Sequence, residues 1–144
     1  MTNRAVTRQI VSTGTTWEPL VGYARAVRVG PHVYVSGTTA TDAAGMVVGD
    51  GDAYRQTIQI LDNIALALKA AGSRIEDVVR TRIFVTDMRD WPAVGRAHRE
   101  IFGAIRPATS MVEVVRLIDQ AMSVEIEAEA YVDSSLPATK DKFQ

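Results

Sequence analysis

Cysteine is absent from this chain of 144 residues. Its absence excludes a disulfide framework, a thiolate-bound zinc or iron–sulfur site and a cysteine nucleophile. Any chemistry must therefore use oxygen and nitrogen groups, and the composition suits a reducing compartment such as the cytosol.

A strong charge of either sign is also missing. Sixteen basic side chains stand against seventeen acidic ones, which gives a net charge of −1 and a pI near 6.1. This balance supplies no field that would gather nucleic acid or an anionic membrane surface, so we expect neither as a partner. No apolar run approaches the roughly 18 residues of a membrane span, and residues 1–8 lack the apolar stretch of a signal peptide. We expect a soluble, cytoplasmic protein.

Familiar cofactor and metal signatures are missing too. Gly49 and Gly51 form a GxG that lacks a third glycine and a preceding long strand, which is typical of a turn. No GxxxxGK[ST] or GxSxG motif occurs, and His32 and His98 are too far apart in sequence for a local zinc pair. We therefore expect no cofactor, no metal centre and no serine triad.

The pattern of apolar residues predicts one α+β domain over residues 1–132, followed by a polar tail over residues 133–144. With 47% apolar residues, a chain of this length can bury one core. The element order β-β-β-α-β-α-β-β fits a mostly antiparallel or mixed sheet with two helices on one face. The predicted strands are 5–11, 24–29, 32–37, 79–86, 109–115 and 123–132, and the predicted helices are 52–71 and 90–102.

Turn and cap residues set the boundaries of these elements. Turn formers over residues 12–19 predict a loop, and Gly30 with Pro31 predicts a tight hairpin. Asp50 or Asp52 can cap the first helix, and Gly72 can close it. Further signals are a reversal at residues 42–45, a capping box at residues 73–76 and a helix start at Asp90 with Pro92 in the first turn.

The sheet face without helices is expected to carry charge. Glu125, Glu127 and Glu129 project from one side of the last strand at intervals of about 7 Å. Either arginines on neighbouring strands neutralise them, or one carboxylate is kept dry enough to move a proton. A partner subunit is the expected cover for this face. The candidate arginines are Arg80, Arg82 and Arg116.

His98 allows two interpretations. It shares the apolar stripe of the second helix with Trp91, Val94 and Ile101. It is either a packing histidine or a neutral imidazole at a cleft edge that titrates near neutrality.

Four stretches resemble the reactive intermediate deaminase (RidA/YjgF) family in order and spacing, and the resemblance covers about residues 20–132. It implies a chorismate-mutase-like α+β fold, a homotrimer with a central β-barrel, and ligand clefts between neighbouring subunits. The stretches are GYARA at 22–26, VYVSG at 33–37, VRTRIFVTD at 79–87, and RPATSMVEV at 106–114 together with VEIE at 124–127.

The resemblance also implies a catalytic site for a small metabolite. Tyr23, Ser36, Gly37 and Glu125 match cleft positions of the family's deaminases, and Glu125 matches the position that activates the attacking water. In those enzymes an enamine becomes an imine, water adds across the C=N bond, and ammonia leaves. An ionised glutamate can accept the proton from that water, and a raised pKa would suit it better to this task.

One position departs from the family pattern. In the deaminases an arginine follows the Pro-Ala pair and grips the substrate carboxylate, whereas here Pro107 and Ala108 are followed by Thr109. A hydroxyl carries no charge, and loss of the charge-assisted anchor weakens binding by about 2–4 kcal/mol. We therefore expect a different specificity.

The positions around Thr109 differ from the family as well. Met111 replaces a frequent cysteine and His98 a frequent aromatic, so both are candidate substrate-binding residues. Arg25, Arg96 or Arg106 could supply the missing positive charge.

Three functions remain open at this point. The first is a hydrolytic deaminase or related hydrolase acting on a small imine or enamine. The second is a trimer that binds a small molecule without turnover. The third, the endoribonuclease activity sometimes attached to the family, conflicts with the balanced charge.

Overall fold

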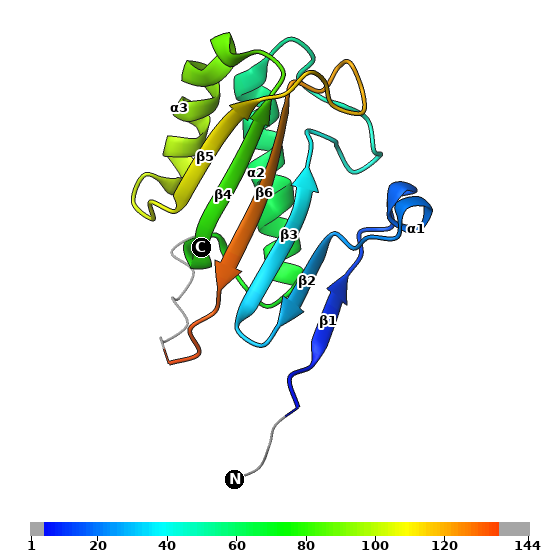
Figure 1. Ribbon diagram of the computed structural model, residues 1–144, viewed down its shortest axis with the longest axis vertical. Helices are drawn as coiled ribbons and strands as arrows, with labels where there is room; N and C mark the ends of the chain where they lie inside the picture. The colour runs from blue at the N-terminus through cyan, green and yellow to red at the C-terminus, as the bar shows by residue number, and fades with distance from the viewer. Residues whose placement is uncertain (1–4, 136–144) are drawn as a thin grey trace.

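Six strands form one mixed sheet in the computed structural model, which describes residues 5–135 (Figure 1). The strand order across the sheet is β1-β2-β3-β6-β4-β5. All neighbours are antiparallel except β4 and β5, which are parallel. The strands are β1 (Arg8–Val11), β2 (Ala26–Val29), β3 (His32–Thr38), β4 (Val78–Val85), β5 (Ala108–Glu113) and β6 (Val124–Tyr131).

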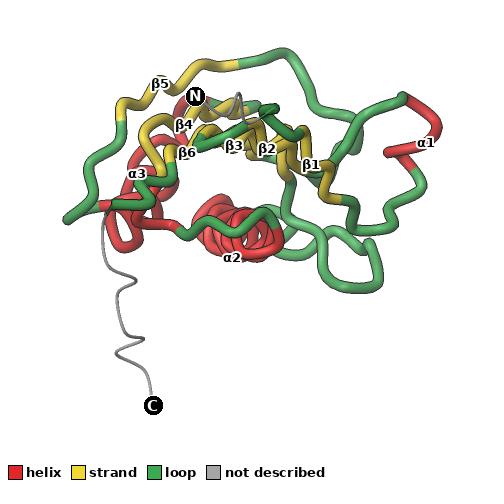
Figure 2. The backbone as a smooth tube through the Cα atoms, turned by 90° about the horizontal axis from the view of Figure 1, so that it is seen from below, coloured by secondary structure: helices red, strands yellow, loops and turns green. Residues whose placement is uncertain are grey.

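Two helices cover one face of this sheet, as predicted (Figure 2). They are α2 (Ala53–Ala70) and α3 (Trp91–Phe102). The Asp52 carboxylate accepts from the Arg55 amide and caps α2. Gly72 takes a φ of 74° just beyond the helix, where its missing side chain avoids strain. The core between helices and sheet includes Ile60, Leu61, Ile64, Leu68, Ile83, Val94, Phe102, Val124 and Ile126.

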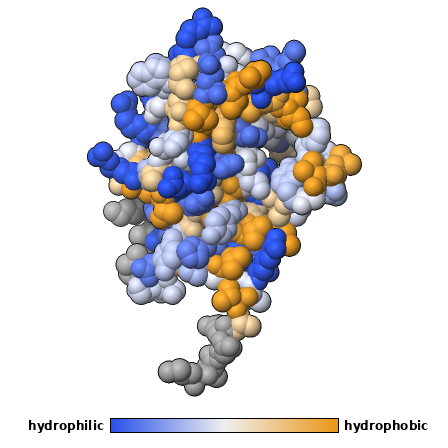
Figure 3. All heavy atoms as spheres, viewed as in Figure 1, coloured by the Kyte–Doolittle hydropathy of each residue, from blue (hydrophilic) through white to orange (hydrophobic). Residues whose placement is uncertain are grey.

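Strict alternation divides the central strands between the two faces. On β6, Val124, Ile126, Ala128 and Ala130 are buried under the helices, and the intervening side chains lie on the open face. The same alternation on β4 buries Thr81, Ile83 and Val85. The open face exposes apolar side chains among charged ones (Figure 3), and they include Ile10, Val29, Tyr34, Val112 and Tyr131.

The hairpin between β2 and β3 confirms the predicted turn. Val29 pairs with His32, so Gly30 and Pro31 form the two-residue connection, and Gly30 has a φ of 59°. The predicted reversal at residues 42–45 is confirmed by a hydrogen bond from the Gly45 amide to the Asp42 carbonyl.

A short helix within residues 12–19 was not predicted. α1 (Trp17–Val21) accommodates Pro19 in its first turn, where a missing N–H does no harm, and Gly22 ends it with a φ of 82°. The Glu18 carboxylate is buried and accepts hydrogen bonds from the amides and hydroxyls of Thr13 and Thr15. The loop of turn formers before α1 is thus attached to the helix by the hydrogen bonds to Glu18.

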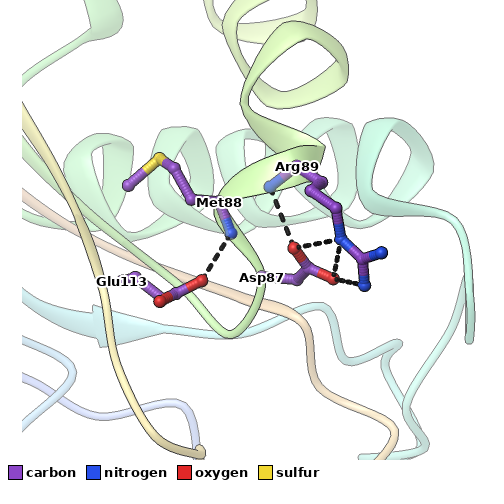
Figure 4. Close-up of polar contacts among 4 residues, drawn as sticks. All are labelled: Asp87, Met88, Arg89 and Glu113. Carbon is purple, nitrogen blue, oxygen red and sulfur yellow. Dashed lines mark hydrogen bonds and ion pairs between the residues drawn. The ribbon is translucent and has the colours of Figure 1, made fainter.

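The start of α3 also differs from the prediction. The Asp90 side chain makes no capping bond, whereas Asp87 accepts from the Arg89 amide and caps the short 3-10 helix η2 (Met88–Asp90) before α3. The Met88 amide donates to Glu113, which links this turn to the end of β5 (Figure 4).

Two further boundaries differ. β1 begins at Arg8 instead of residue 5. The helix expected at residues 73–76 is the 3-10 helix η1 (Ile75–Asp77), and its capping carboxylate belongs to Asp77. The prediction of a polar tail is not tested, because its residues 136–144 lie outside the described residues.

The predicted apolar stripe of α3 was partly wrong. Val94 is buried as predicted, but its buried companions are Ala97 and Phe102, while Trp91 is 58% exposed and Ile101 37%.

Within residues 5–135, no helix combines the length and apolar character needed to cross a bilayer.

Candidate functional site

The glutamates of β6 differ in whether an arginine stands opposite them. On β4, Arg82 is the register partner of Glu127 and Arg80 that of Glu129. Arg82 Nη1 lies 3.5 Å from Glu127 and 2.9 Å from Glu129, and Arg80 Nε lies 4.0 Å from Glu129. The predicted salt-bridge ladder is therefore confirmed for these two glutamates. Arg116, the third candidate, forms no ion pair among the described residues.

Glu125 stands apart because its register partner on β4 is Phe84. No cation lies within 4 Å of its carboxylate in the described part of the chain. Burial, followed by the charge of Glu127, raises the pKa of this carboxyl group, and the positive charge of Arg25 opposes the rise. A half-buried carboxylate with a raised pKa is suited to accept a proton.

Gly37 leaves the space that the Glu125 carboxylate occupies. The pairing of β3 with β6 shifts between Val35 and Thr38, which brings Gly37 beside Glu125. A Cβ atom on Gly37 would lie 3.0 Å from Glu125 Cδ and 3.2 Å from both carboxylate oxygens. Since the backbone of Gly37 does not take a positive φ, this glycine is needed for space and not for conformation.

Arg25 lies on the other side of Gly37. Its Nη2 donates to the Gly37 carbonyl at 2.5 Å, and its Cζ lies 5.7 Å from the centre of the Tyr23 ring. Its Nε is buried without an acceptor, and no carboxylate lies within 4 Å of the guanidinium in the described residues. The Arg25 guanidinium is therefore fixed in position and has no ion-pair partner among the described residues.

Ser36 completes this group, which we call the Glu125 cluster: Tyr23, Arg25, Ser36, Gly37 and Glu125. The Ser36 hydroxyl donates to the Ala24 carbonyl at 2.6 Å, which ties β3 to the segment before β2. Its proton is thus occupied, and its oxygen remains an acceptor. The structure brings these five predicted residues together.

The other predicted site residues form a second group at β5. His98 Nε2 lies 2.9 Å from Thr81 Oγ1, which lies 2.8 Å from Thr109 Oγ1. Burial lowers the pKa of His98, so that its neutral form is favoured. We call His98, Thr81, Thr109 and Met111 the Thr109 cluster. Met111 packs against the core, and Thr109 is exposed.

The two clusters lie on opposite sides of the sheet within one subunit. Thr81 pairs with Thr109 and Ile83 with Met111 on the side covered by helices, whereas Phe84 pairs with Glu125 on the open side. One subunit therefore does not unite all the predicted residues. Thr81 was missed as a site residue because its alternation marked it only as buried.

Neither of two hollows on the single subunit has Glu125 in its wall. A hollow of about 570 Å³ lies between β1, β2 and α1 and has Tyr23 in its wall. A second hollow, of about 390 Å³, lies near Gly30. Within residues 5–135, no three His, Asp or Glu side chains are grouped to hold a metal ion.

Of the three arginines considered as a substitute anchor, only Arg25 belongs to the Glu125 cluster. Arg96 lies over the Tyr54 ring at 4.4 Å, where α3 meets α2. Arg106 is exposed in the loop before β5, with a φ of 58°.

Comparison with known proteins places this architecture in a family. A family model described as endoribonuclease L-PSP matches residues 13–132. The crystal structure of a YjgF/YER057c/UK114-family protein from Mycobacterium tuberculosis is 52% identical, covers 88% of this chain and all of that one, and superposes with a TM-score of 0.81.

Two similar proteins are named as deaminases. The 3-aminoacrylate deaminase RutC of Acinetobacter baylyi is 35% identical over 87% of this chain and 98% of its own length. The 2-iminobutanoate/2-iminopropanoate deaminase of Dermatophagoides farinae is 32% identical over 84% of this chain and 94% of its own. Because the family match covers strands β2 to β6, both long helices and both clusters, the chain belongs to the RidA/YjgF family and has its mixed α+β fold.

Proposed function

We propose that the protein is a hydrolytic deaminase that acts on a small imine or enamine, with Glu125 activating the attacking water. The carrying observation is that Glu125 alone among the three glutamates of β6 has no arginine opposite it and has a raised pKa. Relatives named as imine and aminoacrylate deaminases support the reaction class.

In this mechanism the Glu125 carboxylate accepts a proton from water as the water oxygen adds to the C=N carbon of the protonated imine. The protonated carboxyl group then gives this proton to the amino nitrogen of the carbinolamine. Ammonia leaves as the carbinolamine hydroxyl loses its proton and the carbonyl forms. Neighbouring Arg25 opposes protonation of the resting carboxylate through its charge. The hydroxyls of Tyr23 and Ser36 help to orient the substrate.

The site is completed by a neighbouring subunit of a homotrimer. The open face exposes Ile10, Val29, Tyr34 and Tyr131, which a partner would cover. Because the Thr109 cluster faces away from Glu125 in one chain, a shared cleft would take Thr109 and Met111 from one subunit and the Glu125 cluster from the next. His98 is linked to Thr109 through the hydroxyl of Thr81.

Arg25 binds the substrate carboxylate in this site. It has no ion-pair partner among the described residues and is held beside Glu125 by the Gly37 carbonyl. Thr109 contributes a hydroxyl where relatives are expected to have an arginine, so the substrate is expected to present its acidic group toward Arg25.

A matched pair of variants tests the reaction. The 2-imino acids 2-iminobutanoate and 2-iminopropanoate are generated in situ from amino acids with an amino-acid oxidase, the enamine 3-aminoacrylate is prepared separately, and ammonia release is measured for all three. We expect Glu125→Gln to lower kcat by about 10²- to 10⁴-fold. Glu129→Gln, whose carboxylate is paired with Arg82, should keep it. Full turnover by Glu125→Gln would refute the proposal, and ligand-dependent thermal stabilisation without turnover by the wild type would favour a binding protein.

Mixed trimers test the shared cleft. Glu125→Gln and a Thr109→Trp variant that blocks the other wall are each expected to be inactive. In a random mixture of equal amounts, about one quarter of the clefts would join an intact Glu125 to an intact Thr109, so about a quarter of the activity should return. A cleft built within one subunit would regain none.

A further inference from the structure

Two departures from the family pattern are joined by hydrogen bonds. His98 of α3 and Thr109 of β5 both contact Thr81, whose side chain is fully buried on β4. The two heavy-atom distances, 2.9 and 2.8 Å, are those of good hydrogen bonds. Thr109 is exposed, so this series of hydrogen bonds leads from the surface of β5 to the half-buried imidazole of His98.

The hydroxyl protons of Thr109 and Thr81 can both point along the hydrogen-bonded series toward His98. The Thr109 hydroxyl has one proton and two acceptors, Thr81 Oγ1 at 2.8 Å and the Pro107 carbonyl at 3.2 Å. In the direction that a relay requires, Thr109 donates to Thr81 and the Thr81 hydroxyl donates to His98 Nε2, which acts as an acceptor. The ring proton is then on Nδ1.

The surroundings of His98 favour an imidazole that accepts a proton and releases it. Nδ1 makes no hydrogen bond with a described residue and is not among the buried unpaired atoms, so it is open to water. Burial keeps the pKa of His98 below its ordinary value, and the ring packs against Phe102 at 4.7 Å. The charged groups on the surrounding elements are exposed or paired elsewhere: Arg99 and Glu100 of α3, Arg106 of the next loop and Glu113 of β5 are exposed, and Arg80 and Arg82 of β4 pair with glutamates on the open face.

We propose that Thr109, Thr81 and His98 form a proton relay that removes a proton from the bound substrate, in which Thr109 touches the substrate and His98 is the final acceptor. The inference rests on the proposed function, because it places Thr109 in the cleft. It also gives a role to an uncharged residue at this position, because a hydroxyl can both accept and give a proton, whereas an arginine side chain stays protonated.

The relay completes the proton balance of the reaction. Water adds to the protonated imine, and Glu125 takes one proton, which gives a neutral carbinolamine. Glu125 returns this proton to the amino nitrogen. As the C–N bond breaks and the C=O bond forms, the hydroxyl proton of the carbinolamine passes to Thr109, that of Thr109 to Thr81, and that of Thr81 to His98. The products are the carbonyl compound, ammonia and a protonated His98, which loses its Nδ1 proton to water. Before the next turnover the ring takes up a proton from water at Nδ1, and the Nε2 proton returns through Thr81 and Thr109 to the nitrogen of the incoming imine. This step supplies the protonated imine and restores the starting tautomer of His98.

The kinetic test uses His98→Gln, which keeps an acceptor for Thr81 but cannot take up a proton, and Arg99→Gln as the control. Arg99 is the next residue of α3, and its side chain is exposed. We expect His98→Gln to lower kcat by about 10²-fold and to remove the part of the pH profile in which activity rises as His98 loses its proton. Arg99→Gln should change neither.

A double-mutant cycle separates a relay from simple packing. Thr109→Val should lower kcat as much as His98→Gln, Thr109→Ser should restore it, and the double variant should be no slower than either single one. Wild-type kcat and an unchanged pH profile in His98→Gln would overturn the relay. If Glu125→Gln is inactive in the same assay, the proposed function survives that result, whereas an active Glu125→Gln removes the proposed function itself.

A measurement without substrate tests the relay independently. Nitrogen-15 NMR of the two histidines reports which ring nitrogen carries the proton at neutral pH. The relay requires an unprotonated Nε2 on His98 that responds to Thr81→Val. A proton found on Nε2 would overturn the proposal, because that nitrogen could not accept one from Thr81.

Discussion

Gly37→Ala is the most informative single perturbation of the Glu125 cluster, because it adds one methyl group where the carboxylate lies. The new Cβ would lie 3.0 Å from Glu125 Cδ and 3.2 Å from its oxygens, which is shorter than ordinary contact by a few tenths of an ångström. The carboxylate is the end of a flexible side chain, so it can move and the fold should persist.

The expected loss follows from that displacement. A misplacement of about 1 Å in an active site lowers the rate by about 10²-fold, so a shift of about 0.4 Å should lower kcat by about tenfold. The added methyl group also excludes water, and it should raise the pKa of Glu125 further. The pH at which activity is half-maximal should therefore move upward.

The assay is kcat for the best of the three imine and enamine substrates, measured across pH. Gly95→Ala is the matched control, since a Cβ on this helical glycine meets only Trp91 at 4.0 Å. It should stabilise α3 by about 0.5–1 kcal/mol and leave kcat unchanged. A folded Gly37→Ala protein with wild-type kcat at every pH would show that the carboxylate is not the group that activates water.

Two further predictions concern charge. Because Glu125 must be ionised to accept a proton and its pKa is raised, kcat should fall as pH drops through a value above the ordinary 4.5. The same shift means that folding favours the protonated form, so this group's contribution to stability is complete below the ordinary pKa and is lost as pH rises through the folded value. Glu125→Gln should therefore raise the melting temperature at pH 7, and an unchanged or lower value would contradict the pKa shift. Arg25→Gln should raise KM about 10-fold or more for a carboxylate-bearing imine but not for its uncharged ester, since a hydrogen bond to a charged group contributes about 1.5–3 kcal/mol; equal effects on both would rule out Arg25 as the anchor.

The fold could be predicted from the sequence because two periodicities dominate it. Strict alternation in residues 124–131 identified β6 and its two faces, and the three-and-four spacing identified α2. The five-residue helix α1 was missed because it is too short to show a helical period and follows a run of turn formers. The exposed Trp91 was misplaced since large apolar side chains fit a helical stripe in sequence whether or not a neighbour covers them.

The site was harder to predict, because its chemistry depends on register. Three glutamates on one strand look equivalent in sequence, and only the pairing of Phe84 with Glu125 shows which of them lacks an arginine. Shifting β4 by two residues would place Arg82 opposite Glu125 and neutralise it. The role of Thr81 was hidden for a similar reason, since its neighbours His98 and Thr109 come from elements separated from it by 17 and 28 residues.

The separation of the two clusters has a consequence for specificity. Had Thr109 and Glu125 shared one face of one chain, a single change at either position would alter both walls of the same rigid sheet. Here β4 and β5 hold the Thr109 cluster from the helix side, while β3 and β6 hold the Glu125 cluster on the open side. In a cleft between subunits, the wall that removes the hydroxyl proton and the wall that activates water could then vary independently. A hydroxyl linked to His98 at the position where the resemblance predicts a charged anchor would be a change of this kind, because it would alter one wall and leave Glu125, Gly37 and Arg25 in place.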